Sequence, residues 1–233
     1  MKNVVIVSTF LFVFAANHAL AVDDVATPTV YKVTMSKLEL CTSSACSDAT
    51  ILTDKTQTFN IASAAAGADV GNWVENFALE VGKTYTHIKV TISTTFRIAG
   101  YTTNAAIASA NCVTMATPVT PAAANSPAEV SGSNSTTNAE MAWVIPNMAN
   151  ADNGAAYGDL TAAFGTAGIT RVKDASTFSW VGALANAYTP TASSTPEFTI
   201  AFNVANQLKS TQSAADQCYM WVEPPTVTIT MSG

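Results

Sequence analysis

The chain has 233 residues, only 11% of which are charged, and its formal net charge is −6 at pH 7. An ordinary soluble domain carries about 25% charged residues, so Thr, Ser and Asn supply most of the polarity here. A weak acidic balance without any basic cluster argues against nucleic acid or an anionic membrane as a partner.

Residues 1–21 have the three parts of a secretory signal peptide. Lys2 gives a positive start, Val4 to Ala16 form a nearly unbroken apolar run, and Ala19 to Ala21 bring small residues to the cleavage point. The run is shorter than the roughly 20 residues that span a bilayer. We therefore predict cleavage before Val22, no transmembrane span in the mature chain, and a secreted location, either extracellular, at the cell surface or periplasmic. A retained N-terminal anchor helix is the alternative.

The first segments of the mature chain have the alternation of β-strands. Tyr31, Val33 and Met35 are separated by single polar residues, which is the period of a half-buried strand. The apolar positions then shift to Leu38 and Leu40. Such a shift predicts a β-bulge, which we place near residues 36–37.

Residues 85–101 carry the clearest strand signal in the chain. Five apolar residues lie on one face of the expected strands and polar residues lie on the other, and the apolar ones are Ile88, Val90, Ile92, Phe96 and Ile98. Such alternation is typical of antiparallel sheets with one wet face. Residues 198–204 and 226–231 alternate in the same way.

These patterns together predict an all-β fold. We expect about ten strands in an antiparallel β-sandwich, Ig-like or jelly-roll-like, with no long helix after the leader. Residues 22–233 would form a single domain. The stretch at about 115–140 is rich in Ala, Pro, Ser and Thr, which predicts a long loop. A short helical turn is expected within 157–164.

Four cysteines occur in the chain, at Cys41, Cys46, Cys112 and Cys218. An even number in an exported chain predicts two disulfides, with three possible pairings. We favour Cys41–Cys46, because the residues between them read as the tip of a hairpin whose ends can meet, and this leaves Cys112–Cys218. A zinc site is the alternative, but the spacings lack the close ligand doublets of zinc sites.

Three sequence runs in the first half of the chain carry a family resemblance. They are SKLELC at 36–41, TFNIAS at 58–63 and ALEVGKTYTHIKVTIS at 78–93. In this order they resemble secreted bacterial β-sandwich domains of unknown function, over about Val33 to Tyr101. The resemblance implies fold and export, and it carries no catalytic residues.

Little in the sequence indicates catalysis. The single histidine of the mature chain, His87, lies on the polar face of a predicted strand. The chain has no Gly-x-Ser-x-Gly elbow, P-loop or dinucleotide motif. Residues 152–154 resemble the start of a calcium loop but lack its remaining acidic positions. We therefore expect a protein that is not an enzyme and that uses no metal or cofactor.

Two kinds of function fit a leader, low charge and Thr-rich strands. The favoured interpretation is an extracellular structural or adhesive surface protein, a subunit of a filament or coat that assembles through its β edges by strand exchange. The candidate donated strand precedes the first long strand and comprises Val22, Asp23, Asp24, Val25, Ala26, Thr27, Pro28 and Thr29.

The alternative is a secreted module that binds carbohydrate or another surface ligand. Aromatic side chains stack on sugar rings, although core packing is their commoner role. The candidate platform consists of Trp73, Trp143, Trp180 and Trp221.

Overall fold

The computed structural model describes residues 24–63, 73–74 and 77–233. Within these residues the chain forms sixteen strands, all paired antiparallel, and two short helices. The predicted antiparallel β fold without a long helix is therefore confirmed, while the strand number exceeds the expected ten. Several strands have only three residues, too few for any alternation to be visible in the sequence. The predicted leader, Val22 and Asp23 lie outside the described residues.

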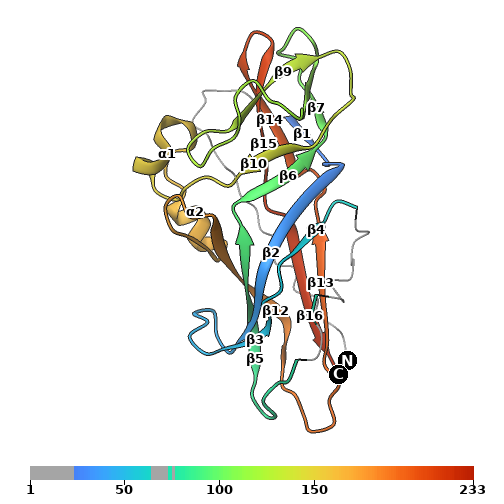
Figure 1. Ribbon diagram of the computed structural model, residues 1–233, viewed down its shortest axis with the longest axis vertical. Coiled ribbons are helices and arrows are strands. Elements are labelled where there is room, and N and C mark those ends of the chain that lie inside the picture. The colour runs from blue at the N-terminus through green and yellow to red at the C-terminus, as the bar shows by residue number, and fades with distance from the viewer. Residues whose placement is uncertain (1–23, 64–72, 75–76) are drawn as a thin grey trace.

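One end of the elongated molecule is a six-stranded sheet (Figure 1). Its outermost strands, first and last in the order, contact each other, so the sheet nearly closes into a barrel. In spatial order the strands are β1 (Asp24–Ala26), β14 (Leu208–Ala214), β15 (Gln217–Val222), β9 (Ala128–Ser133), β8 (Asn111–Val113) and β7 (Tyr101–Thr103).

The other end contains an eight-stranded sheet that is centred on β2 (Val30–Cys41). Strand β2 pairs with four strands, β3 (Ala49–Thr53), β4 (Gln57–Asn60), β5 (Tyr85–Ser93) and β6 (Thr95–Ala99). The sheet continues from β6 to β10 (Met141–Val144), and from β5 through β12 (Thr177–Tyr188) to β11 (Ile169–Arg171). The register of β2 against β5 shifts between Met35 and Lys37, which confirms the predicted bulge.

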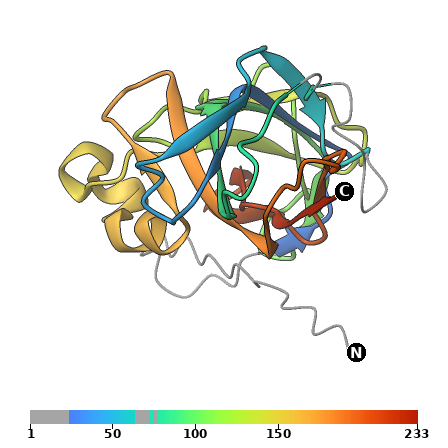
Figure 2. The ribbon, with the colours of Figure 1, turned by 90° about the horizontal axis from the view of Figure 1, so that it is seen from below.

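A two-stranded ribbon of β13 (Glu197–Asn203) and β16 (Thr226–Ser232) covers the inner face of this sheet. Its inward side chains form three cross-strand pairs, which are Phe198–Met231, Ile200–Ile229 and Phe202–Val227. Strand β16 lies against β12. Within the described residues, however, the ribbon shares no hydrogen-bonded ladder with either large sheet. Figure 2 shows the strands arranged around a common interior.

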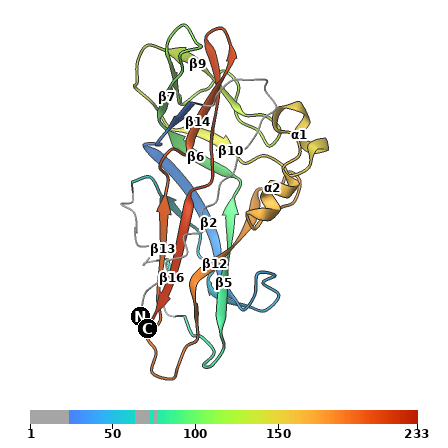
Figure 3. The same cartoon turned by 180° about the vertical axis from the view of Figure 1, so that it is seen from behind.

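The β13–β16 ribbon is continuous in sequence with the β14–β15 hairpin on both of its strands. Strand β13 leads into β14, and β15 leads into β16, but the ladder is interrupted between them (Figure 3). Pro224 and Pro225 lie at this interruption and lack the N–H groups that a ladder needs. On the facing segment, between β13 and β14, Asn206 has a left-handed φ of 61°. The Glu223 N–H donates to the Gln207 carbonyl at 2.8 Å, and beyond this bond the two strands leave one sheet for the other.

The prediction of one long loop at about 115–140 is wrong in part. Strand β9 lies inside it and pairs with both β8 and β15. Ala128 and Val130 are fully buried. Small residues around them mask the apolar alternation in the sequence, so the strand is defined by its neighbours rather than by its own pattern.

The helical part of the chain is larger than the single turn expected at 157–164. Helix α1 spans Asn150–Tyr157 and α2 spans Thr161–Thr166, and the residues between them are not helical. Gly168 ends this segment with a φ of 72°, and a Cβ there would lie 2.2 Å from the Val181 carbonyl oxygen, so only glycine fits. Neither helix is long or apolar enough to cross a membrane, and none of the other described residues forms such a helix.

Both predicted disulfides are present. Cys41–Cys46 closes the hairpin between β2 and β3, and Cys112–Cys218 joins β8 to β15 in the interior of the six-stranded sheet. The second bridge links residues 106 positions apart. Crosslinks over long loops restrict the unfolded chain most, so this bridge is the stronger constraint on the fold.

Candidate functional site

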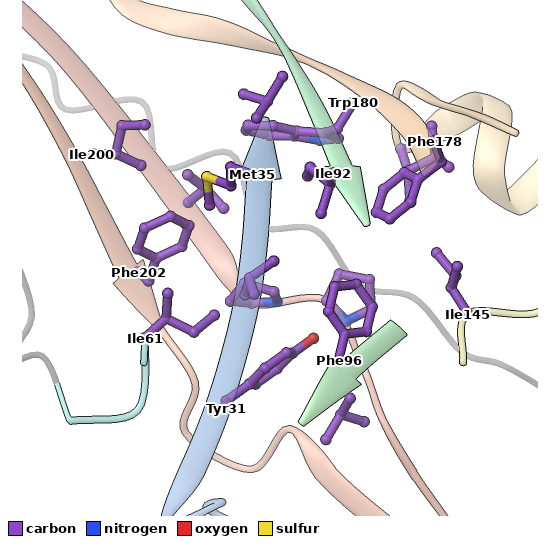
Figure 4. Close-up of a pocket in the computed structure, with 18 of the residues that line it drawn as sticks. Tyr31, Met35, Ile61, Ile92, Phe96, Ile145, Phe178, Trp180, Ile200 and Phe202 are labelled. Carbon is purple, nitrogen blue, oxygen red and sulfur yellow. The ribbon is translucent and has the colours of Figure 1, made fainter. Parts of the chain in front are cut away.

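An apolar cavity lies between the eight-stranded sheet and the β13–β16 ribbon. Its volume is about 90 Å³. Strands β2, β5, β6, β10, β11 and β12 supply one side, and β13, β16 and the interruption at residues 222–225 supply the other (Figure 4). The cavity therefore exists because the ribbon leaves its own sheet and packs on another.

All nineteen residues that line the cavity have apolar or aromatic side chains. None of these lining residues is charged. They are Tyr31, Val33, Met35, Ile61, Val90, Ile92, Phe96, Trp143, Ile145, Ala167, Ile169, Phe178, Trp180, Ile200, Phe202, Val222, Pro224, Pro225 and Val227. Such a surface binds apolar groups by excluding water, and it offers almost nothing to a sugar, whose hydroxyls would lose their hydrogen bonds.

Phe96 is the centre of the aromatic wall. Its ring stacks on Trp143 with centroids 5.5 Å apart, and it meets Phe178 and Tyr31 edge-on at 6.2 and 6.0 Å. Offset-stacked and edge-to-face contacts of this kind hold rings in fixed orientations. This side of the cavity is therefore shaped before any ligand arrives.

Tyr31 contributes the one hydroxyl group among the lining residues. The hydroxyl donates to the Glu223 carbonyl oxygen at 3.2 Å, which ties β2 to the interruption beside Pro224. Burial raises the pKa of Tyr31 well above its ordinary value, and the negative charge of Glu223 adds to the rise. The group therefore stays neutral at physiological pH.

The indole N–H of Trp143 is buried without a hydrogen-bond partner, as is the hydroxyl of Tyr157 on α1. Burial raises the pKa of Tyr157. Tyr157 does not line the cavity, whereas Trp143 does.

Polar contacts on the helical side hold the wall formed by Ile145 and Ile169. The buried guanidinium of Arg171 donates to the Ile145 carbonyl oxygen. The side-chain amide of Asn147 donates to Asp174 at 3.0 Å, and its oxygen accepts from the Asp174 N–H at 3.1 Å. Burial lowers the pKa of Arg171, while the charge of Asp174 opposes the change. These polar groups hold the wall in place but do not themselves line the cavity.

One side of the cavity reaches the surface. Fifteen lining residues are buried, and the four that are partly exposed are Trp180, Pro224, Pro225 and Val227. Trp180 belongs to β12, and the other three lie at and just after the interruption that leads into β16. The mouth of the cavity is therefore at the place where these two strands pass each other.

An empty hole of this size is unfavourable for folding. Unfilled cavity volume costs about 24 cal/mol per Å³, so an empty volume of about 90 Å³ corresponds to a loss of roughly 2 kcal/mol. Apolar cavities of comparable size stay dry and bind small apolar molecules. A ligand that fills the space would recover part of this free energy.

The structure does not bring the four tryptophans together on a surface. Trp73, Trp143 and Trp221 are buried, and Trp73 donates its indole N–H to the Lys55 carbonyl at 2.6 Å. Trp143 and Trp180 both line the cavity, where they face an apolar interior. The exposed sugar platform that their number suggested is therefore corrected to core packing, with two of the four placed at the cavity.

The candidate donated strand pairs within its own chain. Asp24, Val25 and Ala26 form β1 and lie opposite Ser210, Lys209 and Leu208 of β14. Thr27 and Thr29 are anchored by hydrogen bonds to Asn206 and Ala99. Sequence reasoning did not find the cavity, because its lining residues come from ten separate segments and each looks like ordinary core.

Comparisons with protein-family models, curated proteins and solved structures find no match for this chain. The resemblance of residues 33–101 to secreted bacterial β-sandwich domains therefore stays a prediction. The cavity is the feature from which a function can be inferred.

Alkaline pH tests the burial of Tyr31 at the cavity. Above about pH 10 an unfolded tyrosine loses its proton, whereas Tyr31 in the folded chain keeps it, so the folded state binds more protons and the free energy of unfolding falls as pH rises. Each such tyrosine contributes about 1.4 kcal/mol per pH unit. Because the unfolded tyrosine is only partly deprotonated at pH 10, we expect Tyr31→Phe to reduce the decline between pH 10 and 11 by about 1 kcal/mol in urea denaturation, with Tyr157 still contributing. Equal slopes in both proteins would contradict the burial.

Proposed function

We propose that this protein is an exported, non-enzymatic binding protein that holds an uncharged apolar group in the cavity between the eight-stranded sheet and the β13–β16 ribbon. The wholly apolar lining of this cavity carries the proposal. Ligand pockets are mostly apolar and largely preformed, and here the aromatic wall is already fixed by its own ring contacts.

The size of the hollow limits the ligand. A volume of about 90 Å³ accepts a narrow group such as a short alkyl chain, and larger molecules could insert only one end. The mouth leaves room for the rest of such a molecule outside. A ligand with an apolar tail and a polar end at the surface would suit both regions, because the side chains that line the cavity are apolar or aromatic.

Export is supported by the leader pattern in residues 1–21 and by the two disulfides. Disulfides persist in oxidising compartments and are rare in the cytosol. An extracellular or periplasmic protein that binds apolar groups would meet them as dilute, poorly soluble molecules.

Titration with 1-alkanols tests the binding site. We expect 1-hexanol to bind the folded mature protein with a dissociation constant in the millimolar range or tighter, as followed by chemical shifts of the cavity methyl groups. Ala167→Leu adds a bulky side chain at a buried wall position and should weaken binding at least tenfold by occupying the space.

Ala183→Leu is the matched control, since it makes the same change on the exposed outer face of β12. It should leave the affinity unchanged. Absence of alkanol binding in the unmodified protein, or equal binding by both variants, would remove the proposal.

A second candidate function is the surface assembly expected from the sequence, in which copies exchange strands. The observation in its favour is the weak attachment of β1. Among the residues that the structure describes, this strand pairs with β14 at three positions, and its Val25 is exposed. A second copy could supply the same segment to the same position without creating any new kind of contact.

Disulfide trapping separates the exchanged from the closed form. Val25 and Lys209 are directly opposite in the ladder, a geometry in which two cysteines can be bridged. Strand exchange predicts that Val25→Cys/Lys209→Cys yields covalent dimers and longer ladders on a non-reducing gel. Each single variant serves as a control. Only crosslinked monomer would exclude exchange through β1.

A further inference from the structure

The gap between β12 and β16 is closed by a side chain rather than by a ladder. Strand β12 pairs with β5 at residues 177–183 and again at Tyr188, and with β11 at residues 178–180. Strand β16 lies against β12, and in the part of the chain that the structure describes no backbone ladder joins the two. Side chains from the two strands must therefore seal the cavity at this seam.

Trp180 occupies the seam because Gly182 leaves it room. A Cβ on Gly182 would lie 2.5 Å from Cη2 and 2.6 Å from Cζ2 of the Trp180 ring, and 3.2 Å from Cδ1 of Ile229 on β16. The indole therefore lies over Gly182, next to the neighbouring strand. Figure 4 shows the ring at the margin of the cavity.

Trp180 also differs from the other aromatic residues of the lining. Tyr31, Phe96, Trp143, Phe178 and Phe202 are buried, whereas Trp180 is partly exposed. It thus contacts both the cavity and the solvent. Rotating a partly exposed side chain breaks no backbone hydrogen bond and is fast. Lifting the ribbon, in contrast, would expose the buried side chains of Phe198, Ile200, Phe202 and Ile229.

We propose that apolar ligands enter and leave through the seam between β12 and β16, and that Trp180 is the residue that gates this route and limits the width of what passes. The inference rests on the proposed binding function. The buried wall, represented by Ala167, sets affinity, and the Trp180 ring over Gly182 sets access.

A gate and a wall have different kinetic signatures. Removing a gate raises the association and dissociation rates together, while removing part of a wall changes mainly their ratio. We expect Trp180→Ala to raise both rates for 1-hexanol at least tenfold, as measured by NMR exchange, and to admit branched alkanols that bind the unmodified protein slowly. Val181→Ala, which shortens a side chain on the opposite face of β12, is the control and should change neither rate.

The pair of Trp180 and Gly182 provides a second test that does not depend on one variant folding. Gly182→Ala forces the ring from its place and should alter the exchange rates of 1-hexanol. Adding Trp180→Ala removes the atoms that clash, so the double variant should match Trp180→Ala alone. Trp180→Phe keeps a ring but loses the atoms nearest Gly182, and it should give intermediate rates.

The outcomes separate the gate from the site. If 1-hexanol does not bind the unmodified protein, the binding function itself is wrong. If it binds, and Ala167→Leu abolishes binding while Trp180→Ala exchanges ligand at the original rate, the site stands and the gate is overturned. The gate would also be overturned if Gly182→Ala changed the exchange rates of 1-hexanol equally in the unmodified protein and in the Trp180→Ala variant.

Discussion

The interruption of the C-terminal strand pair at Glu223, Pro224 and Pro225 is the constraint from which the rest of the structure follows. Two successive residues without N–H groups end the β14–β15 ladder. The continuing chains then pair as a ribbon that packs on a different sheet. The Tyr31 hydroxyl, bonded to the Glu223 carbonyl, fixes this point against β2. Without the interruption the strands would extend one sheet, and no cavity would form beneath them.

The two ends of the molecule are stabilised in different ways. The six-stranded sheet has its ends in contact and a buried disulfide that joins distant parts of the chain. Over the described residues the ribbon has no backbone ladder to the eight-stranded sheet and is held on it largely by side-chain packing. Local opening concentrates where backbone pairing is lacking, so the seam beside β12 is the place where the fold can admit a ligand at low cost.

The sequence predicted the features that depend on local chemistry. Alternation placed β2, β5, β13 and β16, the apolar shift placed the bulge near residues 36–37, and the hairpin spacing led to the right disulfides. The sequence did not predict the features that depend on how distant segments pack together. Strand β9 is defined by its neighbours on both sides, and the cavity is the space left among residues from distant strands. No single segment indicates the cavity or this strand, because the residues that line a cavity are of the same apolar types as those that fill a core. Pro224-Pro225 was the available signal, since it marks where a strand changes partners.

The most direct measurement of the central claim is a crystal structure of the mature protein under xenon pressure. Xenon enters dry apolar cavities and is visible by its scattering. We expect a xenon atom between Phe96, Val90 and Phe202, with the surrounding side chains in place. Ordered water at that position, or collapsed side chains that leave no space for the gas, would contradict it.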